Sequence, residues 1–181
     1  MNRPTVICKT AADLRLPPNL IDYAATRAVF SWEAVRAELA GLPGGGLNIA
    51  HETVERHAQG ACRDKIAFRF LGVKTTRDIR YGELSRLTNR FANVLKSLGI
   101  GKGERLFLLS GRIPELYVTV LGSFKNGTAV SPLFSAFGPE PIATRINLGE
   151  GAVLVTTELL YERKVAKIRS QLPTLRHVLL V

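Results

Sequence analysis

The sequence has few cysteines, few aromatic residues and no long apolar run. Two of its 181 residues are cysteines, Cys8 and Cys62, and their separation matches no metal-binding pattern. Two ordinary thiols are typical of a reducing compartment, and the N-terminus lacks the apolar core of a signal peptide, so we expect a cytoplasmic protein. Because no apolar stretch approaches the roughly 20 residues needed to cross a bilayer, we expect no membrane partner.

The charge is positive but scattered. Lys and Arg number 25 against 15 Asp and Glu, which gives a net charge of +10 at pH 7. This balance favours anionic partners, such as nucleic acid, a membrane surface or a phosphate-rich small molecule. However, aromatic residues make up only 7% and no run of five like charges occurs. Dispersed charge is typical of a solvated basic surface, so we expect no nucleic-acid partner.

Two segments resemble functional motifs only superficially. His51 and His57 are six residues apart, about 240° around an α-helix, whereas the helical zinc motif needs two His residues at i and i+4. Gly44–Gly46 is followed by neither Lys-Ser nor Lys-Thr and is not preceded by a strand, so it is not a phosphate loop. We therefore expect no metal site on this chain.

Strand and helix signals alternate from residue 66 onward. Alternating apolar residues predict a strand over Ile66–Phe70, and residues 73–80 return beside it as a short β-hairpin. A single apolar stripe predicts a helix over Gly82–Leu98. Short apolar runs, typical of strands buried on both faces, follow at Arg105–Leu109, Ala129–Phe134, Val153–Val155 and His177–Val181. Helices that begin at Pro114, Pro139 and Glu158 separate them, the last predicted to run to Gln171.

This order predicts an α/β fold with a partial parallel sheet of the doubly wound type and flanking helices. We assign it to residues 47–181, which open with a helix over Asn48–His57. Residues 1–46 are expected to form a small helical N-terminal cap and a linker, with Ser31 capping a helix over Trp32–Ala40. Because the last predicted strand has no helix after it, we expect the chain to be the first part of a longer architecture.

Several segments carry a family likeness. Tyr81-Gly-Glu-Leu84 opens a long helix that ends in LGIGKGERL at residue 106, and Phe134–Glu140 reads FSAFGPE. With residues 47–58, 111–133 and 153–158, they resemble the N-terminal portion of AMP-forming acetyl-CoA synthetases, which belong to the adenylate-forming acyl-CoA ligases. The likeness extends from about residue 30 to residue 181.

The resemblance implies a two-step ligase that uses ATP, Mg²⁺ and coenzyme A to activate acetate or another short carboxylate. Such enzymes form an acyl-adenylate and pyrophosphate, after which coenzyme A displaces AMP. The family's phosphate loop and its lid Lys have no counterpart in this sequence. The family's Mg²⁺-holding Glu lies in a Tyr-Gly-x-Thr-Glu motif, and Thr156-Thr157-Glu158 does not match that motif because it lacks the preceding Tyr-Gly. We therefore assign no catalytic residue and no metal ligand, and expect the chain alone to be inactive. The alternative is a stand-alone non-catalytic module that binds coenzyme A or a separate C-terminal half.

The resemblance also implies one binding segment. In acetyl-CoA synthetases an Arg-x-x-Arg segment contacts the 3′-phosphate of coenzyme A. It follows the strand that corresponds to Val153–Val155, and residues 161–167 correspond to the segment itself. Arg163 lies near the first position, Ala166 occupies the second, and Lys164 and Lys167 are further candidates. An α-helix would place Arg163 and Lys167 on one face, and the guanidinium fork suits a phosphate. The alternative is a solvated basic helix face.

Overall fold

The computed structural model describes residues 9–181, and its internal contacts divide the chain into two compact units, residues 1–39 and 40–181. The described part of the first unit contains three short helices: the 3-10 helix η1 (Ala11–Asp13), α1 (Tyr23–Val29) and α2 (Trp32–Ala37). Within residues 9–181, no helix is both long and apolar enough to cross a bilayer. The boundary after residue 46, between the expected cap and linker and the α/β part, stays a prediction.

The helices of the first unit differ from the prediction in two respects. Ser31 caps α2 as predicted and accepts a hydrogen bond of 3.1 Å from the Ala34 amide, but α2 ends before the predicted Ala40. Helix α1 has no counterpart among the predicted helices. Asp22 caps it by accepting a 2.9 Å hydrogen bond from the Ala25 amide, and none of its residues is buried. A helix without a buried stripe produces no periodic signal in the sequence.

The second unit begins with an irregular helical segment where one helix over Asn48–His57 was expected. The π-helix η2 (His51–Glu55) continues into α3 (Arg56–Ala58). The Asn48 side chain accepts hydrogen bonds from the amides of Ala50 and His51, which fixes the start of η2. The predicted helix is therefore present but not regularly α-helical.

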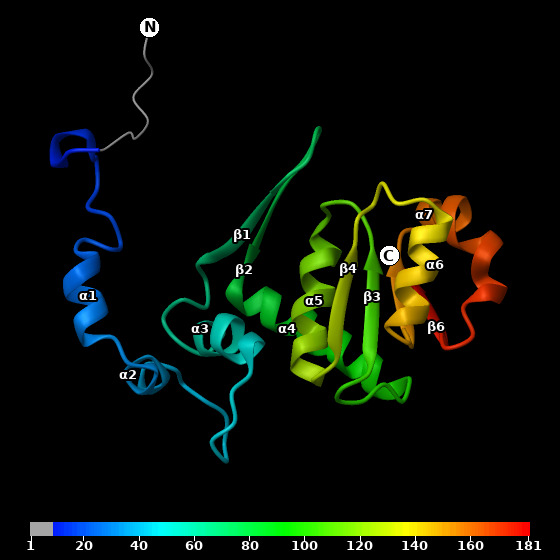
Figure 1. The fold of residues 1–181 in the computed structure, drawn as a ribbon, viewed down its shortest axis with the longest axis horizontal. Helices are drawn as coiled ribbons and strands as arrows, with labels where there is room; N and C mark the ends of the chain where they lie inside the picture. Colours follow the sequence, from blue (N-terminus) through cyan, green and yellow to red (C-terminus); the bar gives the residue numbers. More distant parts are fainter. Residues whose placement is uncertain (1–8) are drawn as a thin grey trace, which may run out of the picture. The chain divides into compact units, whose positions relative to one another are not determined.

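The predicted hairpin and the long helix after it are confirmed (Figure 1). Strand β1 (Ile66–Leu71) pairs antiparallel with β2 (Thr76–Arg80), and helix α4 (Tyr81–Ser97) follows β2 directly. The hairpin turn closes through a 2.8 Å hydrogen bond from the Gly72 amide to the Thr75 oxygen. Buried Ile79 and Leu84 join Phe68 in a small apolar cluster beneath the hairpin.

The second unit is built on a four-stranded parallel sheet in the order β4-β3-β5-β6. Its strands are β3 (Arg105–Leu109), β4 (Ala129–Leu133), β5 (Val153–Thr156) and β6 (His177–Leu180). Each neighbouring pair runs parallel. Helices α5 (Pro114–Asn126) and α6 (Pro139–Leu148) connect β3 to β4 and β4 to β5. The predicted doubly wound α/β class is confirmed.

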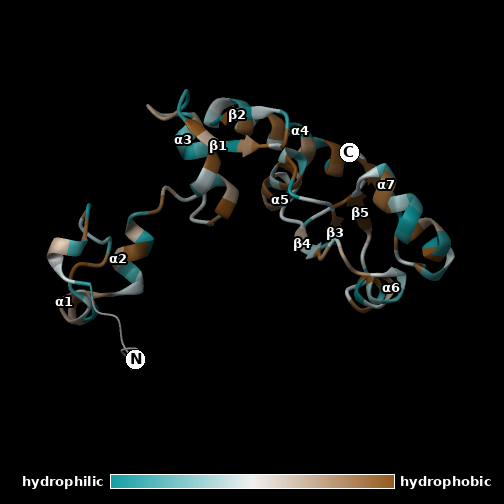
Figure 2. Cartoon of the chain, turned by 90° about the horizontal axis from the view of Figure 1, so that it is seen from above, coloured by the Kyte–Doolittle hydropathy of each residue, from teal (hydrophilic) through white to brown (hydrophobic). Residues whose placement is uncertain are grey.

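Both faces of the sheet are covered, which explains the uninterrupted apolar runs. Along β3, Leu106 and Leu108 point toward one core cluster, which includes Leu95 of α4. Phe107 and Leu109 point toward the other cluster, which includes residues of α6. Figure 2 shows the hydrophobic colour concentrated on β3 and β5 between the flanking helices. A strand buried on both faces has no exposed position at which a polar residue would be favoured.

One glycine ends α5 at the crossover to β4. Gly127 has a φ of 76° in the left-handed region, and its amide donates a 3.1 Å hydrogen bond to the Phe124 oxygen. The Thr128 amide also donates to the Ser123 oxygen at 2.9 Å. Glycine adopts this backbone conformation without a side-chain clash, so it reverses the chain immediately before β4.

Candidate ligand site at the carboxyl edge of the sheet

The direction of the crossovers reverses between β3 and β5. After β3 the chain passes through α5 to β4, and Leu116 and Val120 of α5 pack against the cluster that holds Leu106. After β5 the chain moves in the opposite direction to β6, and Val165 packs against the cluster on the other face. In open α/β sheets, ligands bind at the carboxyl edge beside such a reversal.

A pocket of about 590 Å³ lies at this edge, between the loops that follow β3 and β4. Its lining comprises Ser110, Gly111, Arg112, Leu116, Leu133, Phe134 and Ser135. Ser110 is buried and donates a 3.1 Å hydrogen bond to the Gly111 oxygen, whereas Arg112 is exposed. The pocket therefore combines an apolar floor with a cation at its rim.

The loop after β4 carries two phenylalanines with different surroundings. Phe134 is 65% exposed, whereas Phe137 is partly buried against the core. Their rings meet edge to face with centroids 5.7 Å apart. The guanidinium of Arg145 in α6 lies 4.3 Å from the centre of the Phe137 ring, within range of a cation–π interaction. Phe137 is thus held in place while the Phe134 ring faces solvent.

Lys164 joins this loop to the segment that follows β5. Its Nζ donates hydrogen bonds to the backbone oxygens of Ser135, at 2.5 Å, and Phe137, at 2.9 Å. An ammonium group has three donors, so one remains for another acceptor. The structure therefore brings one of the predicted site residues to the FSAFGPE segment.

The other predicted site residues are Arg163 and Lys167. Their side chains are exposed, and within residues 9–181 neither side chain makes a hydrogen bond or an ion pair. The premise for pairing them was an α-helix over Glu158–Gln171, and that premise is wrong. Only Glu158–Leu160 (α7) is α-helical, and the π-helix η3 (Tyr161–Val165) and the 3-10 helix η4 (Ala166–Gln171) follow. These helices turn by different angles per residue, so a spacing of four no longer defines one face. The role of Arg163 and Lys167 in binding coenzyme A stays a prediction.

Sequence reasoning missed two residues at this edge, Arg112 and Arg145. Arg112 could have been found from its position, since it lies three residues after the end of a buried parallel strand. Arg145 could not, because its contact with Phe137 depends on how α6 turns back beside the loop. The backbone oxygens that receive Lys164 are likewise invisible to motif analysis.

The described residues contain no cluster of metal-ligating side chains. Between residues 9 and 181, no group of three His, Cys, Asp or Glu side chains could hold a metal ion. Thr156 is buried at the end of β5, and Thr157 caps α7 by accepting a 3.4 Å hydrogen bond from the Leu160 amide. These two threonines therefore serve the strand and the cap.

Comparison with known proteins gives one family and several relatives. The family described as AMP-binding enzyme matches residues 54–181. Acetyl-coenzyme A synthetase of Bacillus subtilis is 35% identical over 164 residues, which is 90% of this chain and 28% of that protein. The same enzyme of Methanothrix thermoacetophila is 40% identical over 122 residues, which is 66% of this chain and 18% of that protein. The chain thus spans less than a third of the length of these curated relatives.

Solved structures agree with the fold. The crystal structure of an acyl-CoA synthetase of Brucella canis matches with a TM-score of 0.73 and 29% identity, covering 88% of this chain and 28% of that one. An anthranilate CoA ligase in complex with anthranoyl-AMP matches with a TM-score of 0.66 and 22% identity, covering 75% of this chain and 25% of that one. The second likeness concerns the fold alone.

Proposed function

The chain belongs to the family of AMP-binding enzymes, and we propose that it is the N-terminal part of an ATP-dependent ligase that joins coenzyme A to acetate or another short carboxylate. The observation that carries this proposal is the family match over residues 54–181, together with the acetyl-coenzyme A synthetase relatives. The position of Phe134–Glu140 at the carboxyl edge of the sheet supports it, since ligands bind there in open α/β folds.

The proposed reaction has two displacements. A carboxylate oxygen attacks the α-phosphorus of ATP, so that pyrophosphate leaves and an acyl-adenylate forms. The sulfur of coenzyme A then attacks the acyl carbon, so that AMP leaves. We assign neither displacement to a residue of this chain, and its proposed contribution is the scaffold and part of the coenzyme A site.

Coenzyme A is the ligand that best fits the basic segment Arg163–Lys167 at the carboxyl edge of the sheet. The side chains of Arg163 and Lys167 are exposed, and the guanidinium fork of Arg163 matches phosphate oxygens. Lys164 holds the loop that presents the exposed Phe134 ring, against which a base could stack. In this proposal Arg163 binds the 3′-phosphate, Lys167 is a second candidate cation for it, and Lys164 positions the loop.

A second candidate is a stand-alone module that binds coenzyme A, or a separate C-terminal half, without catalysis. One observation favours it: Lys164, which follows Arg163 directly, donates hydrogen bonds to the backbone oxygens of Ser135 and Phe137, so this chain alone joins the basic segment to the loop that carries Phe134. Coenzyme A binding by the 181-residue chain without a C-terminal half is expected under this candidate. Absence of such binding would contradict it.

A cytoplasmic location is also a proposal. It is supported by the low cysteine content of the sequence and by Cys62, which forms no disulfide. The other cysteine, Cys8, lies outside the described residues.

Pyrophosphate exchange tests the proposed ligase. We expect the 181-residue chain to show no acetate-dependent exchange of pyrophosphate into ATP, and a complete ligase that begins with this chain to show it. Within that ligase, Arg163→Ala should raise the KM for coenzyme A by about three- to tenfold, because a charge-assisted hydrogen bond is lost. Adenylation should be unchanged. Arg90→Ala, on the exposed face of α4, is the matched control.

Two results would contradict parts of the proposal. Exchange by the 181-residue chain alone would show that catalytic groups lie within it. An unchanged KM for coenzyme A in both Arg163→Ala and Lys167→Ala would show that the basic segment is only a solvated surface.

A further inference from the structure

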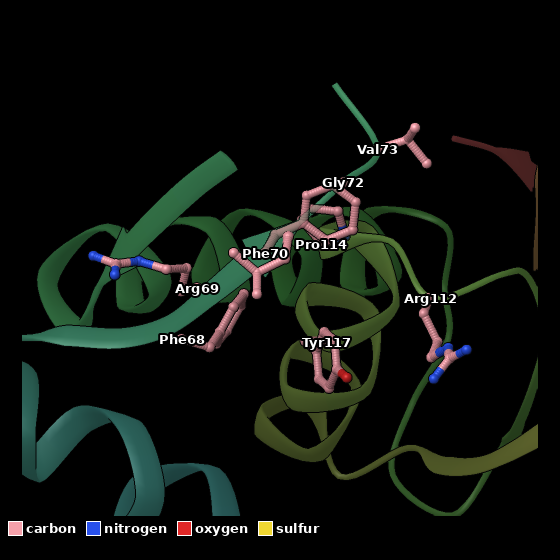
Figure 3. Close-up of a pocket in the computed structure, with 9 residues that line it drawn as sticks. Phe68, Arg69, Phe70, Gly72, Val73, Arg112, Pro114 and Tyr117 are labelled. Atoms are coloured by element: carbon pink, nitrogen blue, oxygen red, sulfur yellow. The ribbon is translucent and has the colours of Figure 1, made fainter. Parts of the chain in front are cut away.

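A second pocket, of about 590 Å³, lies between the hairpin and the start of α5 (Figure 3). Strand β1 contributes Phe68 and Phe70, and α5 contributes Pro114 and Tyr117. The rings of Phe68 and Tyr117 are in contact, with centroids 5.2 Å apart and planes tilted by 41°. The volume falls within the range of about 300 to 1,000 Å³ that is usual for small-molecule sites.

The unpaired polar side chains of this pocket lie at one end. Figure 3 shows Arg112 at the opposite end from Phe68, with the Tyr117 hydroxyl turned toward the Arg112 end. Neither the Arg112 guanidinium nor the Tyr117 hydroxyl has a hydrogen-bond or ion-pair partner in the described part of the chain. The pocket therefore has an aromatic region and, beside it, one unpaired cation and one free hydroxyl.

The second arginine of the pocket does not add a free charge. Arg69 donates two hydrogen bonds to the Asp78 carboxylate across the hairpin, at 2.5 and 2.8 Å. Figure 3 shows its guanidinium turned away from Arg112 and Tyr117. A polyphosphate would require several unpaired cations, whereas a single guanidinium matches a single carboxylate.

We propose that this pocket binds a small carboxylate that carries an aromatic ring. The carboxylate pairs with Arg112 and accepts a hydrogen bond from the Tyr117 hydroxyl. The ring packs against Phe68 and Phe70, because aromatic rings make favourable edge and offset contacts with one another. The proposal depends only on residues of this pocket and does not rest on the proposed ligase reaction, so either can fail without the other.

Titration of the ¹⁵N-labelled 181-residue chain with 3-phenylpropanoate tests the proposal. We expect amide shifts to change at residues 68–73 and at residues 112, 113 and 115–117, with a Kd of about 1 mM, as is usual for a ligand of this size. The neutral 3-phenylpropanamide should bind about three- to tenfold more weakly, because it forms no charge-assisted hydrogen bond. Acetate, which lacks the ring, should produce no saturable change below about 10 mM.

Conservative variants separate the two ends of the pocket. Arg112→Gln should weaken 3-phenylpropanoate binding by about three- to tenfold, and Tyr117→Phe by about two- to threefold, since each removes one partner of the carboxylate. Phe70→Leu should weaken it by about twofold or more, because the ring contact is lost. Arg90→Gln removes the same charge from the exposed face of α4 and should leave the Kd unchanged.

Several outcomes would overturn the proposal. They are no shift change at residues 68–73, equal affinity for the amide and the carboxylate, and an unchanged Kd in a folded Arg112→Gln variant. Shift changes produced equally by acetate would show a general anion site without the aromatic contact. The spectrum of the buried strands verifies that each variant is folded.

Discussion

Lys164 donates a 2.9 Å hydrogen bond to the backbone oxygen of Phe137, which lies 27 residues earlier in the chain. One residue follows β5 and the other follows β4, so the bond connects two loops at the carboxyl edge of the sheet. The same ammonium also binds the Ser135 oxygen. The position of the FSAFGPE segment therefore depends on a side chain outside it.

Replacing Lys164 with Met should loosen this loop while keeping the apolar stem. We expect the free energy of unfolding to fall by about 1–2 kcal/mol, because two backbone acceptors lose a charged donor. Hydrogen exchange at the Phe137 and Gly138 amides should accelerate. Lys167→Met is the matched control: Lys167 is exposed, so unfolding should change by less than about 0.5 kcal/mol. Equal effects of the two substitutions would contradict a positioning role for Lys164.

Gly122 allows α4 and α5 to approach closely. A Cβ at this position would lie 2.8 Å from the Thr88 oxygen and 3.0 Å from the Cβ of Phe91, both in α4. Gly122→Ala should therefore force the helices apart and cost about 1–3 kcal/mol in chemical denaturation. At Gly111 a Cβ would meet nothing within 4 Å, so Gly111→Ala should be close to neutral. A neutral Gly122→Ala would show that this helix contact readily adjusts.

Leu154 lies at the centre of the parallel sheet and is completely buried. Leu154→Ala should lower the free energy of unfolding by about 2–5 kcal/mol, because it removes apolar contacts and leaves a cavity. Leu148, at the end of α6, is 85% exposed. Leu148→Ala should change unfolding by less than about 0.5 kcal/mol. Urea denaturation measures both changes. Similar losses of unfolding free energy in the two variants would contradict the assignment of Leu154 to the core.

Glu55 connects η2 to the helix pair α4 and α5. Its carboxylate accepts a 2.7 Å hydrogen bond from Ser85 and forms an ion pair with Lys125, whose side chain is only 10% exposed. Burial by itself would raise the pKa of Glu55. The hydrogen bonds from Lys125 and Ser85 and the charges of Lys125 and His51 outweigh burial, so the pKa is lowered from its ordinary value of 4.5.

This lowered pKa sets the sign of a pH effect. The ionised carboxylate stabilises the fold above the unfolded-state pKa near 4.5, and the contribution is lost as the pH falls through the lower folded-state pKa. Glu55→Gln should cost about 1–2 kcal/mol at neutral pH, and its difference from the wild type should shrink in acid. Urea denaturation at a series of pH values measures this difference. Glu162 is exposed, so Glu162→Gln should show no such pH-dependent difference from the wild type. A difference for Glu55→Gln that stays constant with pH would contradict the lowered pKa of Glu55.

The candidate site could be predicted from the sequence only in part. The FSAFGPE segment and the basic residues after β5 were identifiable because each is a local pattern. The argument that paired Arg163 with Lys167 was wrong because η3 and η4 do not turn like an α-helix. Contacts such as that of Arg145 with Phe137 depend on elements brought together only by the fold.

The order of strands and helices in residues 66–181 was determined by the sequence itself. Strands such as β3 and β5 are buried on both faces and are therefore apolar except at one end, at Arg105 and Thr156. The helices that follow them carry capping and breaking residues that are visible locally. Only the tertiary structure decided that β3 lies between β4 and β5, and that Lys164 meets the loop after β4. Strand order and side-chain contacts follow from crossovers that join distant segments, and local sequence patterns contain no record of which segments will meet.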